Sequence, residues 1–119
     1  MVDDEAMLVQ LGCAQLERLG YEAVGCTDSD TALETFRAAP ARFDLVITDA
    51  TMPGMAGVTL AHELRRLRPD IPIILCSGSH ESLDHQRTTA PGIAAILPKP
   101  WSPQELVHTI QRVCQPSHP

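Results

Sequence analysis

The sequence predicts an α/β fold, with one doubly wound parallel sheet of five strands and helices on both faces. Segments with the 3.6-residue apolar period of helices alternate along the chain with short apolar runs, which is typical of α/β folds. The runs are apolar at successive positions, as in parallel strands covered on both faces. At 119 residues, the chain suits one domain over residues 1–119, with 115–119 as a tail.

The first half of the chain predicts two helices and two strands. The first helix ends at Gly20, which suits a left-handed cap, and its expected buried face is Leu8, Leu11, Gly12, Leu16 and Leu19. Residues 21–26 then predict a short strand. A second helix begins near the polar run 27–30, stops before Pro40, and buries Ala32, Leu33 and Phe36. A buried strand follows at 45–47, and Asp49 lies just past its end.

The second half continues the alternation. A third helix is closed by Pro69; it is expected to bury Leu60, Ala61, Leu64 and Leu67 and to leave Arg65, Arg66 and Arg68 in water. Strands are predicted at 71–76 and 94–97. Between them, the segment 80–91 has one large aliphatic residue, Leu83, so we expect it to be the most mobile element.

The last helix carries its own start signal. Ser102 can cap it, Pro103 fits its first turn, and Glu105 can reach back to complete a capping box. Its expected buried face is Leu106, Val107, Ile110, Val113 and Cys114. Trp101 is expected to pack beneath this helix.

The pattern also requires a buried strand before Asp3. Only Met1 and Val2 stand there, whereas a typical strand has about 5 residues. We therefore expect the first strand to be largely missing from the numbered chain. A fragment of a longer protein is favoured over a truncated strand, because a sheet without most of an interior strand should be badly destabilised.

Composition excludes several classes of protein. With 9 basic and 15 acidic residues, the formal charge is −6, which argues against binding nucleic acid or anionic membrane. No apolar run approaches the roughly 20 residues of a membrane span, and the acidic start is unlike a signal peptide. The four cysteines lack metal-site spacing. We expect four buried thiols, a reducing compartment and a cytoplasmic location.

Several polar residues follow the carboxyl ends of the predicted strands, where ligands bind in open parallel sheets. These residues are Asp3, Asp4, Asp49, Ser77 and Lys99. Three carboxylates in one crevice are only partly offset by Lys99, which is the single lysine of the chain. A hard divalent cation would supply the positive charge that Lys99 alone does not. Mg²⁺ is the default because it accepts carboxylates, water and phosphate oxygens as ligands. The balanced site would then accept a phosphoryl group.

These residues also resemble a known family in their order along the chain. Asp3-Asp4-Glu5, the run 43–49, the run 52–57, Ser77 and Lys99-Pro100 are similar to a two-component response-regulator receiver domain. The resemblance implies a flavodoxin-like sheet of order 2-1-3-4-5. It also implies that Asp49 takes a phosphoryl group from the phosphohistidine of a histidine kinase.

The resemblance assigns roles to the other site residues. Mg²⁺ would be held by Asp4, Asp49 and the backbone carbonyl of Thr51, with Asp3 acting through water. Lys99 would contact a phosphoryl oxygen, and Ser77 would donate a hydrogen bond to the group. Thr51 and Ser79 would tune the lifetime of the acyl phosphate. Phosphorylation would shift the Ser77 to Trp101 surface, although Ile96 stands where many relatives carry an aromatic switch residue.

The implied partners are a histidine kinase or a phosphotransfer domain, and a homodimer through the last strand and last two helices. The domain would catalyse only its own phosphorylation and dephosphorylation, and a parent chain could be a hybrid histidine kinase. One alternative is a degenerate receiver that acts only as an interaction module. Another is an aspartate-nucleophile phosphohydrolase, but such enzymes need a second aspartate two residues after the nucleophile, where this chain has Thr51.

Overall fold

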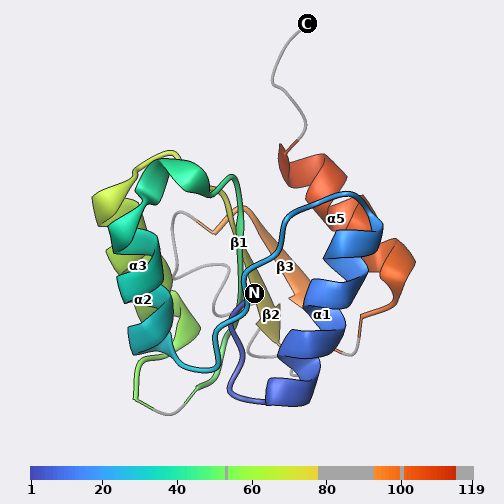
Figure 1. Ribbon diagram of the computed structural model, residues 1–119, viewed down its shortest axis with the longest axis horizontal. Coiled ribbons are helices and arrows are strands. Elements are labelled where there is room, and N and C mark those ends of the chain that lie inside the picture. Colours follow the sequence, from blue (N-terminus) through green and yellow to red (C-terminus); the bar gives the residue numbers. More distant parts are fainter. Residues whose placement is uncertain (53, 78–92, 100, 115–119) are drawn as a thin grey trace, which may run out of the picture.

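The structure is an α/β sandwich of three layers, seen in a computed structural model that describes residues 1–52, 54–77, 93–99 and 101–114 (Figure 1). Strands β1 (Val46–Asp49), β2 (Ile73–Ser77) and β3 (Ala95–Pro98) form a parallel sheet in that order. This confirms the strands predicted at 45–47, 71–76 and 94–97. The segment 80–91, Ser79 and the tail 115–119 lie outside the described residues.

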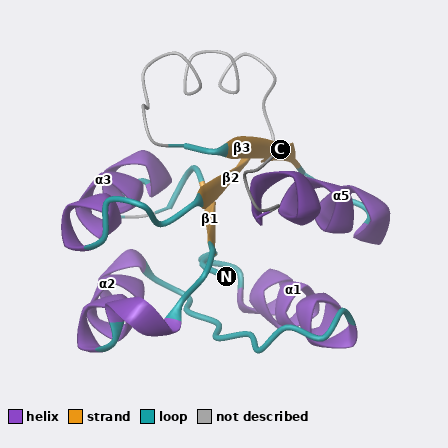
Figure 2. Cartoon of the chain, turned by 90° about the horizontal axis from the view of Figure 1, so that it is seen from above, coloured by secondary structure: helices purple, strands orange, loops and turns teal. Residues whose placement is uncertain are grey.

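The helices cover both faces of the sheet, as predicted. Figure 2 shows α1 (Ala6–Arg18) and α5 (Pro103–Cys114) on one face, and α2 (Ser29–Ala38) and α3 (Gly57–Leu67) on the other. A short 3₁₀ turn, η1 (Pro40–Arg42), joins α2 to the approach of β1. All strands run the same way, so their carboxyl ends share one edge.

Helix caps lie where the sequence predicts that α2 and α5 begin and that α1 ends. The Asp28 carboxylate accepts a hydrogen bond from the Thr31 N–H at 2.7 Å and starts α2. Ser102 and Glu105 form the reciprocal capping box of α5, at 2.9 and 3.1 Å. After α1, Gly20 has a φ of +96°, the left-handed conformation expected for its cap.

The strand predicted at 21–26 is not formed in the described structure, so this prediction was wrong. Val2 forms isolated parallel bridges with Cys26 on one side and Thr48 on the other, and these bridges are not extended into named strands. The described residues thus contain three strands. The order of a five-stranded sheet stays a prediction, although Val2 lies between the segment 21–26 and β1 as that order requires.

Two apolar clusters hold the layers together, one on each face of the sheet. The α2–α3 face packs around Val2, Phe36, Leu60, Leu64 and Ile73. The α1–α5 face packs around Leu16, Ile47, Leu97, Leu106 and Ile110, with Met1 and Trp101 partly buried against it. The predicted packing of Trp101 is confirmed, and its indole N–H also bonds the Gln15 side chain at 3.0 Å.

The buried faces of the outer helices differ from prediction by about one position. In α1 the buried residues are Val9, Gly12 and Leu16, while Leu11 is 53% exposed and Leu19 42%. Gly12 faces inward, and the Met1 side chain fills the space that a Cβ at this position would take. In α3, Leu67 is partly exposed. In α5, Thr109 is buried beside Leu106 and Ile110, and Cys114 is exposed.

Two other expectations from the sequence need correction. Cys26 and Cys76 are buried, but Cys13 is half-buried and Cys114 is exposed. The expectation of four buried thiols was therefore wrong. Arg68 is not a solvated residue of α3. Its guanidinium donates to the backbone carbonyls of Pro40 and Phe43 and pairs with Asp70, and it thereby fastens η1 to the end of α3.

The start of α3 lies unusually close to the end of β1. The Gly57 N–H bonds the Ala50 carbonyl at 3.0 Å, and a Cβ on Gly57 would overlap the backbone carbonyl oxygen of Asp49 and press on Leu75. Only glycine allows this approach. Gly57 therefore sets the position of the backbone that carries Asp49.

We predict that Gly57→Ala lowers the free energy of unfolding by about 1–3 kcal/mol, the usual cost of overpacking. Helix propensity alone predicts the opposite sign. Urea unfolding measures the change, and Thr59→Ala at an exposed position of α3 is the matched control. A Gly57→Ala protein that is as stable as the control would contradict the close approach.

Candidate functional site

The predicted polar residues meet at the edge formed by the carboxyl ends of the strands. Asp49 is the last residue of β1 and Ser77 the last of β2, while Lys99 directly follows β3. Asp3 follows Val2, whose backbone bonds Ile47 and Asp49 at 2.8 Å each. The spacing in sequence is therefore converted into proximity by the parallel register of the sheet.

Lys99 is the electrostatic centre of the site. Its ammonium Nζ lies 2.8 Å from Asp3 Oδ2 and 3.0 Å from Asp49 Oδ1. Both carboxylates are largely buried, which makes these ion pairs stronger than those on a surface. The Lys99 backbone N–H also bonds the Ser77 carbonyl at 2.9 Å. One lysine thus joins the ends of three strand segments.

The Asp3 carboxylate is fixed from both of its oxygens. Oδ2 accepts a hydrogen bond from the Lys99 ammonium. Oδ1 accepts one from the backbone N–H of Glu5, just before α1, at 2.9 Å. The residue is only 2% exposed. Because both oxygens already have partners, Asp3 is held rigidly within the site, whereas Asp4 beside it is exposed.

Burial and pairing act against each other on Asp49 and Lys99. For Asp49, desolvation is the largest influence and raises the pKa of the carboxyl, helped by the charge of Asp3 and opposed by Lys99. For Lys99, desolvation lowers the pKa, but the hydrogen bonds and charges of Asp3 and Asp49 together outweigh it and leave the pKa raised. The lysine therefore stays charged, while Asp49 is incompletely compensated.

The donor set suits a hard divalent cation. Carboxylate oxygens of Asp3, Asp4 and Asp49 all lie within 4.8 Å of one another, and one ammonium offsets three negative charges. Oxygen-only ligands with this charge fit Mg²⁺ better than softer metals. Burial and the neighbouring charge of Asp3 raise the pKa of Asp49, and a bound cation would favour its ionised form.

Within the described residues, the other members of the predicted set are Thr51, Ser77 and Ile96. Thr51 is exposed two residues after Asp49, and Ser77 is buried at the end of β2. Ile96 is half-buried within β3, opposite Leu75 of β2. Ser79 lies outside the described residues. The buried Cys76 next to Ser77 is inert as a nucleophile, because burial raises the pKa of its thiol to about 12.

Some residues that position the site were not predicted. Gly57 sets the Asp49 backbone, as described above. The sequence indicated it only as the last residue of the run 52–57 and as a glycine at the start of an amphipathic helix. Ser29 is buried at the start of α2, and its hydroxyl donates to the Met55 carbonyl at 2.8 Å. This bond ties the loop after Asp49 to α2, and nothing in the sequence spacing indicated it.

Comparisons with known proteins give one consistent result. The family model described as the response regulator receiver domain matches residues 1–111. The sensor kinase CckA of Brucella abortus is 32% identical over 97% of this chain, and the transcriptional regulatory protein BaeR of Escherichia coli is 34% identical over 98%. The chain spans 12% of the length of that CckA and 48% of that BaeR.

Solved structures agree in fold. The chemotaxis response regulator CheY4 of Vibrio cholerae is 32% identical with a TM-score of 0.82, over 94% of this chain and 93% of that one. A response regulator receiver domain protein from Clostridium thermocellum is 26% identical with a TM-score of 0.87, over 95% of this chain and 90% of that one.

Among the described residues, no helix has the length and apolar character to cross a membrane.

We predict that Asp49→Asn stabilises the protein in the presence of EDTA. The pKa of Asp49 is raised in the folded state, so neutralising this carboxyl favours folding just as proton uptake would. The expected gain at pH 7 is about 1 kcal/mol, the usual scale of single substitutions, measured by urea unfolding. Asp44→Asn, at an exposed position, should leave stability unchanged. A loss of stability in Asp49→Asn would show that Lys99 already balances the site.

Proposed function

The chain belongs to the response regulator receiver domain family, and we propose that Asp49 is its phosphoacceptor. The observation that carries this proposal is the placement of Lys99 between Asp49 and Asp3, in a cluster of three carboxylates at the strand ends. Such a cluster needs a cation, and with one it can accept a dianionic phosphoryl group. Phosphoryl transfer relies mainly on positioning and charge neutralisation.

In the proposed reaction, an Asp49 carboxylate oxygen attacks the phosphorus of a phosphohistidine. An oxygen–phosphorus bond forms, the phosphorus–nitrogen bond breaks, and the imidazole leaves with its electron pair. The Lys99 ammonium, which pairs with Asp49 Oδ1 before the reaction, turns to a phosphoryl oxygen afterwards. The Ser77 hydroxyl donates a hydrogen bond to the same group. Short ion pairs to a compact ammonium suit this exchange of partners.

The residues fit Mg²⁺, which we propose is held by Asp4, Asp49 and the Thr51 carbonyl, with Asp3 acting through water. The partners of Asp3 support this division, since Lys99 and the Glu5 N–H occupy its two oxygens. Asp4 is exposed and carries no such bonds among the described residues. When bound, the ion neutralises charge on the phosphoryl oxygens. Tuning of the acyl-phosphate lifetime is assigned to Thr51 and Ser79.

Phosphorylation is proposed to shift the surface from Ser77 to Trp101. The link between the Ser77 carbonyl and the Lys99 N–H supports this coupling, because a shift of either residue reaches the other. Trp101 in turn is tied to α1 through Gln15. Ile96 offers no aromatic ring to the switch, so the movement is assigned to Ser77 and to the segment 80–91, which lies outside the described residues.

The proposed phosphoryl donor is a histidine kinase or a phosphotransfer domain, in the cytoplasm. The match to the sensor kinase CckA supports a parent chain of the hybrid kinase type. The domain itself is proposed to catalyse only its own phosphorylation and dephosphorylation. A homodimer through the last strand and last two helices is also proposed. Part of that surface falls on residues 78–92, outside the described structure.

We predict a single phosphoryl adduct on the wild-type protein after incubation with acetyl phosphate and Mg²⁺, seen by intact mass. Asp49→Asn should remove it, because the nucleophilic oxygen is replaced by an amide. Asp44→Asn should keep the adduct, since Asp44 is exposed and outside the carboxylate cluster. An adduct of equal yield on Asp49→Asn would place the phosphoacceptor elsewhere, and no adduct on folded wild type would indicate an interaction-only receiver.

We predict that Asp4→Asn weakens Mg²⁺ binding by at least about tenfold, since it removes one of few charged ligands. Stability without the metal should change little, because Asp4 is exposed and takes no part in the ion pairs of Lys99. Isothermal titration with MgCl₂ measures the affinity. Glu5→Gln, at the exposed next residue, is the control. Equal affinities for both variants would remove Asp4 from the metal site.

A further inference from the structure

The loop that follows Asp49 carries the backbone of Thr51, whose carbonyl is one of the proposed Mg²⁺ ligands. It runs from Ala50 to Ala56, between β1 and α3, and Pro53 within it lies outside the described residues. Figure 1 shows the loop and the start of α2 at the same end of the molecule, where the strands end. A backbone carbonyl serves as a ligand only when the surrounding structure holds it in place. The contacts that fix this loop therefore bear on the metal site.

Backbone hydrogen bonds fix the first part of the loop. The Ala50 N–H bonds the Cys76 carbonyl of β2 at 2.8 Å, and the Ala50 carbonyl accepts the Gly57 N–H at 3.0 Å. Burial raises the pKa of Asp49, and a hydrogen bond from the Thr51 backbone N–H is among the influences that oppose this rise. The loop therefore begins against the sheet, with Thr51 directed by its N–H toward the Asp49 carboxylate.

Ser29 of α2 holds the part of the loop that follows Thr51. It is the first residue of the helix and is buried, and its hydroxyl donates to the Met55 carbonyl at 2.8 Å. The same hydroxyl lies 3.8 Å from the Met52 sulfur. Met52 is buried in the α2–α3 cluster, and Met55 packs against it from the surface. One hydroxyl thus contacts the loop at two residues, the first of which directly follows Thr51.

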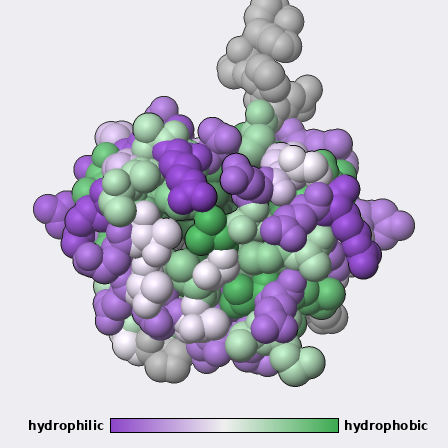
Figure 3. All heavy atoms as spheres, in the orientation of Figure 1, coloured by the Kyte–Doolittle hydropathy of each residue, from purple (hydrophilic) through white to green (hydrophobic). Residues whose placement is uncertain are grey.

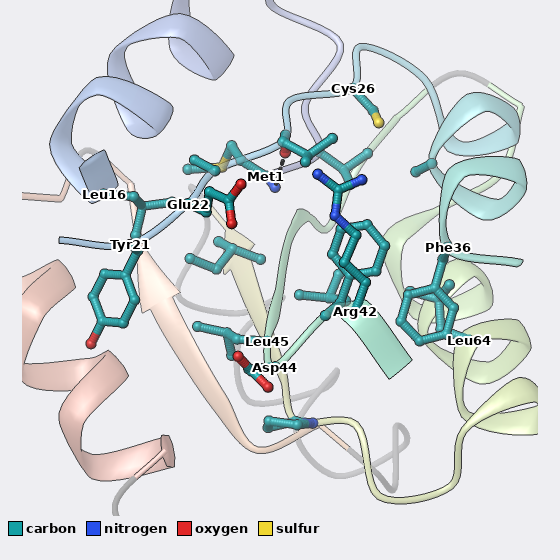
Figure 4. Close-up of a pocket in the computed structure, with 18 of the residues that line it drawn as sticks. Met1, Leu16, Tyr21, Glu22, Cys26, Phe36, Arg42, Asp44, Leu45 and Leu64 are labelled. Carbon is teal, nitrogen blue, oxygen red and sulfur yellow. Dashed lines mark hydrogen bonds between the residues drawn. The ribbon is translucent and has the colours of Figure 1, made fainter. Parts of the chain in front are cut away.

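Helix α2 is a firm anchor because its inner face is part of the core. Phe36 and Ala32 are buried, and Figure 4 draws Phe36 together with Leu64 of α3 on this side of the sheet. The outer face is polar, since hydrophilic side chains protrude over α2 and α3 at the left margin of Figure 3. The Asp28 cap fixes the start of the helix beside Ser29. The core therefore sets the position of Ser29, and Ser29 in turn holds the loop.

Serine at the start of a helix usually serves as the cap of that helix. Ser29 does not have this role, because Asp28 is the cap of α2 and the Ser29 hydroxyl donates to a residue 26 positions away. Stability of α2 does not call for the hydroxyl either. Alanine has the better helix propensity and brings no polar group that must be satisfied when buried. The bond to the loop is therefore the reason for a serine at this position.

We propose that Ser29 is a positioning residue for the Mg²⁺ site, which holds the loop in the conformation in which the Thr51 carbonyl can act as a ligand. This inference rests on the proposed function, because it concerns the ion assigned to Asp4, Asp49 and Thr51. Without the bond, the loop populates other conformations, and the apparent metal affinity falls with the fraction of molecules whose loop is competent. The net worth of one neutral hydrogen bond corresponds to a loss of about three- to tenfold.

Isothermal titration with MgCl₂ compares the wild-type protein with Ser29→Ala and Leu33→Ala. Ser29→Ala should bind Mg²⁺ about three- to tenfold more weakly. Leu33 lies about one turn further along α2 and packs on the same apolar cluster. Leu33→Ala should therefore lower stability in urea unfolding but leave Mg²⁺ affinity unchanged. Wild-type affinity in Ser29→Ala, or an equal loss of affinity in both variants, would overturn the proposal.

Amide hydrogen exchange in EDTA tests the loop without the metal. In Ser29→Ala, the Thr51 and Gly57 amides should exchange at least about threefold faster than in wild type, relative to the Leu75 amide in the centre of β2, because the loop opens locally. Leu33→Ala should leave this ratio unchanged. An unchanged ratio in Ser29→Ala would show that the loop holds its conformation without the hydroxyl, which would overturn the proposal.

Asp4→Asn separates the role of Ser29 from the proposed function. Weaker Mg²⁺ binding in both Asp4→Asn and Ser29→Ala supports the metal site and the positioning role together. A loss of affinity in Asp4→Asn with wild-type affinity in Ser29→Ala would overturn the role of Ser29 and leave the metal site in place. A folded wild-type protein that does not bind Mg²⁺ would overturn both.

Discussion

The ion pairs of Lys99 are the constraint on which the rest of the structure depends. Lys99 and Asp3 are 96 residues apart in the sequence, and Asp49 lies between them, so the three meet only if the ends of separate strand segments are aligned. That alignment rests on the parallel register of the sheet and on the bonds of Val2 to β1. It also rests on Gly57, whose missing side chain lets α3 approach Asp49. Local features that look unrelated therefore serve one electrostatic arrangement.

This arrangement is a compromise between stability and chemistry. Burial, helped by the charge of Asp3 and opposed by Lys99, leaves Asp49 with a raised pKa, and a buried charge without full compensation costs folding free energy. A fold selected only for stability would neutralise or remove one acid. The retained imbalance is what the proposed Mg²⁺ ion and phosphoryl group would use. The buried Cys76 beside the site, with its raised pKa, adds no competing nucleophile.

Much of this was predictable from the sequence, and the failures share a physical cause. Local patterns and strand polarity predict the buried strands, the start of α2 near 27–30 and the Ser102 cap. They also predict that Asp3, Asp49 and Lys99 meet. The strand at 21–26 failed because, among the described residues, its one bridge joins Cys26 to Val2, and a single bridge does not make a strand. The buried face of α1 and the bonds of Arg68 depend on what packs against them. Likewise, the pairing of Lys99 with Asp3 in preference to Asp4 is decided by geometry, which residue spacing does not contain.

A structure of the protein with Mg²⁺ and the phosphoryl analogue trifluoroberyllate tests the central claim most directly. The account predicts the analogue on an Asp49 carboxylate oxygen, the metal on Asp4 and Asp49, and Lys99 moved from Asp49 Oδ1 to a fluorine while it keeps Asp3. A metal outside the carboxylate cluster, or an analogue on another residue with the Lys99–Asp49 pair intact, would contradict it.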